Sequence, residues 1–411
     1  DLKFIVVTDD KFFDKLKNFD NKLIAQELVK YFRENKIDYP YFRIMGPNVH
    51  TMFKNIKYIK SYFTHEKYDL GDQKDAMFVL PLEFNLNDTQ KYYLYDYDSS
   101  IYDDTDILAD YFIEYSRLHC KRGNASKNAL DIWYDYDSTL FKTLLNVVTK
   151  YKNLKIIEIK KQFQRLTQEC SGEKSTFYVS LFKLLYDDPT KIKILDAAAG
   201  YGNRLLGAMA ANVKEYIGIE PNILSHDAFK EIINSFKKYC SKENRYQVLL
   251  GGLPDIKLNE KYDKNYFDIC IISPPSYNSE IYSQDSEQSI IKYSDEKSWT
   301  IEFLYKTLDK IWKTIKKEGY LIVQSILNKV INPYIYTNLP NASYAGCISV
   351  RTMAGRNKPM WIWKKTNKQF FELPNKNIVY QEVKYNSELK IPYFKRLRIV
   401  FITEPKGIYY V

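Results

Sequence analysis

The sequence has few cysteines and no cluster of metal-binding residues. Its five cysteines lie far apart and include no Cys-x-x-Cys pair: Cys120, Cys170, Cys240, Cys270 and Cys347. The four histidines are just as scattered: His50, His65, His119 and His226. Disulfide scaffolds and structural zinc sites show much denser patterns of these residues. We therefore expect no disulfide scaffold, no metal site and a reducing compartment, the cytoplasm or another intracellular one.

Long apolar runs are also lacking. No stretch of eighteen apolar residues occurs, so we expect no transmembrane helix and no membrane partner. The opening DLKFIVVTDDKFFDK has no basic segment followed by an apolar one, which a secretory signal needs. Only 14 glycines and 14 prolines are present, and 45% of residues are hydrophobic, which excludes collagenous and disordered chains. A chain of 411 residues with this composition is expected to fold into two or three domains.

Arginine is scarce, because only eleven of the 61 basic residues are Arg. The net charge of +10 is unevenly distributed. Residues 1–150 carry 21 basic and 24 acidic residues, a balance of −3, and the remainder has a balance of +13. A basic half favours a polyanionic partner such as nucleic acid, whereas a solvated lysine-rich surface is the alternative.

The first 150 residues give mixed signals and are expected to form an accessory α+β domain. The apolar spacing in 21–35 predicts a helix, and 75–84 (DAMFVLPLEF) has strand character. The Tyr/Asp-rich stretches 93–110 and 131–138 match no EF-hand spacing, so we interpret them as an acidic surface that could face a protein partner. Residues 121–128 (KRGNASKN) resemble a linker.

After about residue 150, short apolar strands alternate with amphipathic helices, which predicts a mostly parallel, doubly wound α/β sheet. The catalytic domain is expected over 151–370, and 371–411 is a basic C-terminal extension with strand-like character. The expected helix over 300–317 has Gly319 just past its end. Two further runs, 342–352 and 359–365, should pair as an antiparallel hairpin that closes the sheet edge. The expected strands are 191–195, 216–219, 247–250, 267–272 and 320–326, and the other expected helices are 203–211 and 226–240.

A glycine-rich turn follows the first of these strands, in ILDAAAGYGNRLLGA. Asp196 ends the strand, and Gly200 and Gly202 let the backbone bend sharply before a helix begins near residue 203. Ala198 stands where a dinucleotide fingerprint would have its first glycine. Glu220 ends the next strand, where a carboxylate could accept hydrogen bonds from ribose hydroxyls. This turn suits S-adenosylmethionine (SAM) or a nicotinamide cofactor, and a purely structural turn is a third reading.

A second motif, FDICIISPPSY, follows the fourth strand of this region. It resembles the [DNS]PP[YFW] loop of the SAM-dependent amino-methyltransferases, including phage and large-virus enzymes that methylate N6 of adenine. The resemblance covers about residues 190–365 and implies a seven-stranded Rossmann-like methyltransferase sheet with SAM as cofactor. The segment that follows the two prolines is also similar to that of the phage and large-virus enzymes, at Glu280, Tyr282, Gln288, Tyr293 and Trp299.

The resemblance assigns roles to individual residues. Ser273 and the carbonyl of Pro274 would accept hydrogen bonds from the target amine, and Pro275 would make the loop rigid. The sequence departs from the family at the aromatic position, where Ser276 stands. Either Tyr277, one residue later, stacks on the flipped base after a small loop shift, or another aromatic does, or the site is degenerate. An acidic or polar residue usually follows the third strand near the cofactor's adenine, and Asp255 is the candidate here.

Three basic residues near the expected hairpin are candidates for contacts with nucleic-acid phosphates: Arg351, Arg356 and Lys358. An ordinary edge hairpin with its tryptophans in the core is the alternative. The leading hypothesis is methyl transfer from SAM to an exocyclic amine of DNA or RNA, with N6 of adenine favoured and N4 of cytosine possible. The rivals are a non-catalytic, methyltransferase-like nucleic-acid-binding subunit of a heteromeric enzyme and a methyltransferase of protein or small-molecule amines.

Overall fold

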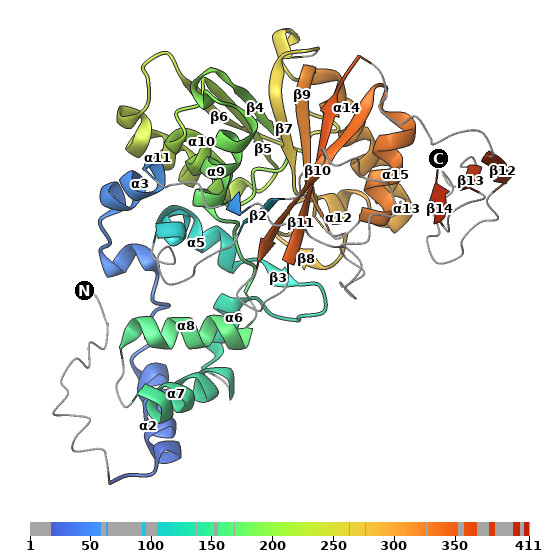
Figure 1. The fold of residues 1–411 in the computed structure, drawn as a ribbon. Coiled ribbons are helices and arrows are strands. Elements are labelled where there is room, and N and C mark those ends of the chain that lie inside the picture. Colours follow the sequence, from blue (N-terminus) through green and yellow to red (C-terminus); the bar gives the residue numbers. More distant parts are fainter. Residues whose placement is uncertain are drawn as a thin grey trace. The chain divides into compact units, whose positions relative to one another are not determined.

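The chain forms two compact units (Figure 1). The computed structural model describes residues 18–58, 63–64, 93–95, 105–136, 138–151, 155–167, 169–262, 264–275, 277–325, 328–351, 357–367, 378–382, 398–402 and 407–410. Unit 1 comprises Asp1–Val49, Ala109–Gly172 and Asn278–Gln284, and unit 2 comprises His50–Leu108, Glu173–Tyr277 and Asp285–Val411. The boundaries differ from those expected at 150 and 370, because helices on both sides of residue 150 pack together and three separate segments make up each unit.

Unit 2 is built on one large sheet that confirms the expected doubly wound α/β class. Five neighbouring strands are parallel, in the order β9-β7-β4-β5-β6, and β11 joins them antiparallel beside β9. From one edge, the strands are β6 (Arg245–Leu250), β5 (Glu215–Glu220), β4 (Lys193–Asp196), β7 (Phe267–Ile272), β9 (Ile315–Gln324), β11 (Asn357–Lys365) and β10 (Ala342–Arg351). This seven-strand order, with a single reversed strand, is consistent with the Rossmann-like methyltransferase sheet that the resemblance implies.

Helices cover both faces of the sheet because its central strands are largely apolar, and β5 is buried at every position, including its two terminal glutamates. On one face, α14 (Lys306–Thr314) and α15 (Asn328–Asn338) pack into a core with the odd-numbered residues of β4 and β5. The opposite face carries α9 (Ser175–Leu185), α10 (Asn203–Ala210) and α11 (His226–Phe236). Gly207 allows α10 to approach α9, since a Cβ there would lie 2.7 Å from the Cβ of Tyr178.

Two expectations about this sheet were wrong. The hairpin of β10 and β11 forms, but it does not close the edge, because β2 (Tyr93–Tyr95) pairs with β10 and β1 (Phe63–Thr64) pairs with β2. The helix expected over 300–317 ends at Thr314, after a π-helical turn at Trp299–Tyr305. Gly319 therefore lies inside β9 rather than beyond a helix end, and a Cβ there would lie 2.8 Å from the Asp268 carbonyl.

The described part of unit 1 is mainly helical. Its helices are α2 (Asn21–Glu34), α5 (Asp110–Leu118), α6 (Ala129–Asp135), α7 (Ser138–Tyr151) and α8 (Ile156–Thr167). The expected helix over 21–35 is thus confirmed, with Asp20 accepting hydrogen bonds from two backbone amides of its first turn. Trp133 and Phe163 lie in the centre of the core, with ring centroids 5.0 Å apart. The strand expected over 75–84 lies outside the described residues.

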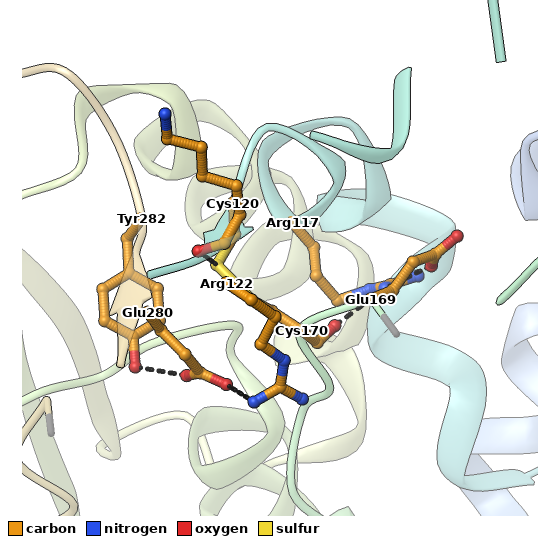
Figure 2. The surroundings of a disulfide bond; sticks show 8 residues. Arg117, Cys120, Arg122, Glu169, Cys170, Glu280 and Tyr282 are labelled. Atoms are coloured by element: carbon orange, nitrogen blue, oxygen red, sulfur yellow. Dashed lines mark hydrogen bonds and ion pairs between the residues drawn. A yellow bond between two sulfur atoms is a disulfide. The ribbon is translucent and has the colours of Figure 1, made fainter. Parts of the chain in front are cut away.

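A disulfide joins Cys120 to Cys170 in unit 1 (Figure 2), which the scattered cysteines and the expected reducing compartment did not predict. The two cysteines are 50 residues apart in sequence, but α6, α7 and α8 fold between them and bring their Cα atoms to 6.2 Å. Directly after Cys120, β3 (Lys121–Arg122) pairs with β8 (Glu280–Ile281). Figure 2 shows Arg122 reaching Glu280, with a distance of 2.6 Å between its Nη1 and the carboxylate.

The C-terminal extension contributes a separate antiparallel sheet of β12 (Ile378–Glu382), β13 (Arg398–Ile402) and β14 (Gly407–Tyr410). Its strand-like character is thereby confirmed. Among the described residues, no helix is long and apolar enough to cross a membrane. Nor does the described part of the chain bring three or more His, Cys, Asp or Glu side chains together as a metal site.

Candidate cofactor and substrate site

The glycine-rich turn lies between β4 and α10, as predicted. Gly200 and Gly202 have φ values of +57° and +78°, a left-handed conformation that favours glycine. Gly202 precedes the first residue of α10, and a Cβ there would lie 3.2 Å from Ile232 of α11. The turn therefore needs glycine at residue 202 for both backbone conformation and packing.

The carboxylate of Asp196 ends β4 but faces the protein interior, with none of the residue exposed. Arg204 of α10 donates to it from Nε at 2.7 Å, and the hydroxyl of Tyr216 donates at 2.6 Å. The backbone N–H of Ala198 also donates to this carboxylate, at 3.3 Å. Asp196 thus ties the start of the turn to the first turn of α10 and to β5.

Arg204 is the centre of this buried network, and the sequence patterns did not single it out. Besides Asp196, it donates to the carboxylate of Glu173 and to the carbonyl of Ala198. Burial would lower the pKa of Arg204, but the two carboxylates outweigh that effect and hold it well above its ordinary value. The sequence did contain a signal: an arginine in the first turn of a helix that follows an acidic strand end is well placed to pair with that acid.

Glu220 is the acidic residue at the end of β5, and its surroundings differ from those of Asp196. One carboxylate oxygen accepts the N–H of Gly200 at 2.8 Å, and the other accepts the N–H of Asn222 at 3.0 Å. Burial raises the pKa of Glu220 to about 7, even though the two N–H groups favour its charged form. No basic side chain among the described residues forms an ion pair with it, and 9% of the residue remains exposed. The carboxylate thus joins the turn to the end of β5.

The three predicted motifs lie at the carboxyl ends of three neighbouring strands. In the register of the sheet, Asp196 of β4 stands beside Gly218 of β5 and Ile271 of β7. Glu220 and Ser273 each follow two residues after those partners. The edge therefore brings the turn, Glu220 and the Ser-Pro-Pro segment to one place, the position at which open α/β sheets bind ligands.

The Ser-Pro-Pro segment follows β7 directly. Ser273 is half-buried and Pro274 is buried. Tyr277 has a φ of +42°; its hydroxyl donates to the Ser294 carbonyl at 2.9 Å, and its ring meets Trp299 edge-on with centroids 5.8 Å apart. Ser276, at the family's aromatic position, lies outside the described residues. Tyr277 is thus anchored at both its ring and its hydroxyl.

The last residue of β6 and a residue just after β5 add apolar surface to the same edge. Leu250 is the register partner of Glu220 and is 51% exposed, and Ile223 is 52% exposed. Asp255 lies further along, where Lys292 approaches its carboxylate at 3.1 Å and the Tyr293 hydroxyl donates at 3.0 Å. These two partners lower the pKa of Asp255, against a burial effect that would raise it.

The predicted basic contacts fall partly within the described residues. Arg351 ends β10 and Lys358 is the second residue of β11; the two strands pair antiparallel with Val350 opposite Lys358. Because β10 runs parallel to β9, both residues lie at the edge of the sheet that carries the Ser-Pro-Pro segment. Arg356 lies outside the described residues.

Comparison with known proteins gives no family assignment. No protein-family model matches the chain, and no curated protein matches it. Among solved structures, a tRNA m1G37 methyltransferase of M. jannaschii is 14% identical, with 46% of this chain and 48% of that chain covered and a TM-score of 0.30. A SAM-dependent methyltransferase from Methanosarcina mazei is 9% identical, with 43% and 93% covered and a TM-score of 0.29. The [4+2]-cyclase SpnF is also 9% identical, with 46% and 80% covered and a TM-score of 0.31. Likenesses at this level carry no argument about activity.

Proposed function

We propose that unit 2 binds S-adenosylmethionine and transfers its methyl group to an exocyclic amine of a base in DNA or RNA, with N6 of adenine favoured over N4 of cytosine. The observation that supports this most is the adjacency of three strand ends. The glycine turn after β4, Glu220 after β5 and Ser273 after β7 occupy neighbouring strands of one sheet. A cofactor site and an amine-accepting loop are therefore side by side.

The residues present fit the cofactor. Glu220 holds a carboxylate at the edge with no cationic partner among the described residues, and vicinal ribose hydroxyls would supply two donors to it. Ile223 and Leu250 expose apolar surface beside it, which suits an adenine ring. At the half-buried Gly200 the turn carries no side chain, so its backbone is open to a ligand, whereas Gly202 is buried against α11. In this site the cofactor would supply an electrophilic methyl group.

The chain's own contribution to the chemistry is positioning and polarisation of the amine. The hydroxyl of Ser273 and the carbonyl of Pro274 both accept hydrogen bonds from the two N–H groups of an exocyclic amine. Such contacts draw the nitrogen lone pair away from the ring and hold it in one direction, so the amine becomes a better nucleophile. Two prolines in succession keep the accepting carbonyl in place. Tyr277 is the candidate for stacking on the base, and Arg351 and Lys358 for phosphate contacts.

The test separates cofactor binding from transfer. Incubation with labelled SAM and separate pools of DNA and RNA, followed by nucleoside mass spectrometry, should reveal one methylated base. Ser273→Ala should lose most transfer and keep SAM affinity in calorimetry, whereas Ser279→Ala, an exposed serine six residues on, should change neither. Absence of SAM binding by the wild-type chain would refute the proposal.

A second candidate is a non-catalytic nucleic-acid-binding subunit. It is favoured by Ser276 at the aromatic position and by the anchoring of Tyr277 on Trp299 and Ser294. It predicts binding of nucleic acid without methyl transfer until a partner chain is added, and the acidic first 150 residues are the proposed surface for that partner. A cytoplasmic location remains part of the proposal, and a Cys120–Cys170 disulfide that persists in cell extracts prepared with a thiol-blocking reagent would count against it.

A further inference from the structure

A groove of about 720 Å³ opens over β5 and β6 of unit 2, beginning at their amino ends. Its floor is formed by alternate residues of the two strands, because Glu215 and Ile217 stand in register with Arg245 and Gln247. The turn, Glu220 and Ser273 lie at the opposite, carboxyl ends of the strands. The lining extends along β6 as far as Leu249 but includes no residue of the turn and none of Glu220, Ser273 and Leu250, so the groove is distinct from the proposed cofactor and amine sites.

The groove exists because one crossover lacks a helix. The connections β4–β5, β5–β6 and β7–β9 contain α10, α11 and α14, whereas the described part of the β6–β7 connection holds only a 3₁₀ turn at Glu260–Tyr262. That connection covers the face of β5 and β6 incompletely. Its residues form one wall of the groove, and the connection between α11 and β6 adds Lys237 and Asn244.

The lining carries four cations: Lys237, Arg245, Lys257 and Lys261. Within the described part of the chain, the first three make no salt bridge and no side-chain hydrogen bond. The one acid in the lining, Glu215, already has partners. It accepts the hydroxyls of Tyr262 and Tyr266 at 2.9 and 2.5 Å, and Lys261 lies 3.6 Å away.

Glu215 therefore does not offset the free cations. It is 4% exposed, and its hydrogen bonds lower its pKa in spite of a burial effect that would raise it. The three unpaired cations come from separate places: Lys237 from the end of α11, Arg245 from the start of β6 and Lys257 from the β6–β7 connection. A single phosphate needs its cations to converge, whereas a chain of phosphates is matched by cations spaced along a groove.

We propose that this groove binds the phosphodiester backbone of the nucleic-acid substrate. The inference rests on the proposed function. Backbone contact is favoured over base contact because the aromatic rings of the lining are engaged: Tyr262 is buried, and the Tyr246 hydroxyl donates to the Val213 carbonyl at 2.9 Å. The groove anchors the polymer at a distance from the amine-accepting loop and contributes affinity without reading sequence.

Fluorescence anisotropy with a labelled single-stranded oligonucleotide, measured across a salt series, tests this. The triple variant K237Q/R245Q/K257Q should flatten the slope of log K against log salt by about 2, since each phosphate contact contributes about 0.7. At 0.1 M salt this corresponds to about 100-fold weaker binding. The variant should melt like wild type, because these side chains have no described partners to lose.

The matched control removes the same charge from exposed lysines elsewhere in unit 2 that likewise form no salt bridge among the described residues: Lys297, Lys313 and Lys317. It should leave the salt slope within experimental error of wild type. Equal losses of oligonucleotide affinity in the two triple variants would overturn the proposal, because they would show that the loss depends on total charge and not on the groove. Competition by inorganic phosphate beyond that of chloride at equal ionic strength would also overturn it, because it would indicate a small-anion site.

The outcome is separable from that of the proposed function. The groove variant should keep wild-type SAM affinity in calorimetry, and its methyl transfer should recover at high oligonucleotide concentration. If the wild-type chain binds oligonucleotide through the groove but binds no SAM, the proposed function fails and the groove stands. If SAM binding and transfer are normal and the groove variant binds oligonucleotide like wild type, the groove fails and the proposed function stands.

Discussion

The carboxyl of Glu220 should make cofactor binding depend on pH near neutrality. Burial raises its pKa to about 7 in the ligand-free protein. Ribose hydroxyls can donate hydrogen bonds to the charged form, so a bound cofactor should favour the carboxylate and bring its pKa back down. Binding should then release a proton wherever the free protein holds one, which is below about pH 7.

The magnitude follows from the two pKa values. If binding returns the pKa of Glu220 to its ordinary value of 4.5, every protein molecule that holds this proton must release it when the cofactor binds. This weakens the affinity at pH 6 to about a tenth of that at pH 8. Stability of the ligand-free protein has the opposite trend. A carboxyl whose pKa is raised by folding stabilises the fold below its unfolded pKa, and this contribution, about 3 kcal/mol, is lost as pH rises through 7.

Calorimetric titration with SAM at pH 6, 7 and 8 measures the affinity, and repetition in two buffers of different ionisation enthalpy counts the protons released. Glu220→Gln is the control. It should bind more weakly at every pH, and any pH dependence that remains belongs to the ligand's own amino group. Either of two results would refute the reasoning: the same pH dependence of affinity in wild type and Glu220→Gln between pH 6 and 8, or no release of a proton when SAM binds at pH 6.

Three further outcomes are expected. Reduction of the Cys120–Cys170 disulfide should lower the free energy of unfolding of unit 1 by about 4 kcal/mol, from a sequence separation of 50 residues, and urea melts with and without reductant would check it. Arg204→Met should cost about 3–5 kcal/mol in the same assay, because it leaves the buried carboxylate of Asp196 and the partly exposed one of Glu173 without a counter-ion; a change under 1 kcal/mol would argue against the network. Gly202→Ala should cost about 2 kcal/mol in thermal melts and Gly46→Ala only about 1, because both have positive φ but only the first would crowd a neighbour.

The strands of unit 2 could be predicted because each is a short apolar run ended by a turn signal. Their mostly parallel arrangement followed from the alternation of strands and helices. Pairings that join distant segments could not be predicted in this way. The addition of β2 to β10 joins Tyr93 to Ile348, and no local pattern indicates such a partner.

The misplaced helix end at Thr314 has a local cause. Ile315 continues the helical spacing of α14, yet it is also the first residue of β9 and pairs with Phe267. An apolar residue at this position satisfies both periodicities, so the pattern cannot decide between them. Glu318 adopts a φ of +64° where the strand bulges. Because of this bulge, the first half of β9 does not show the alternation of apolar and polar residues that predicts a strand.

Asp196 lies where the sequence predicts it, but its carboxylate bonds within the protein and does not face a ligand. The sequence placed an acid at the end of the first strand beside the glycine turn, and the structure has it there with none of its surface exposed. Its carboxylate accepts hydrogen bonds from Arg204 and Tyr216. Asp196 therefore affects a ligand indirectly, by fixing the conformation of the turn. Glu220 has no such cation and stands at the next strand end. Of the two acids, Glu220 is therefore the one left to accept hydrogen bonds from a cofactor, and a loss of affinity in Asp196 variants should be accompanied by a loss of stability that Glu220 variants do not share.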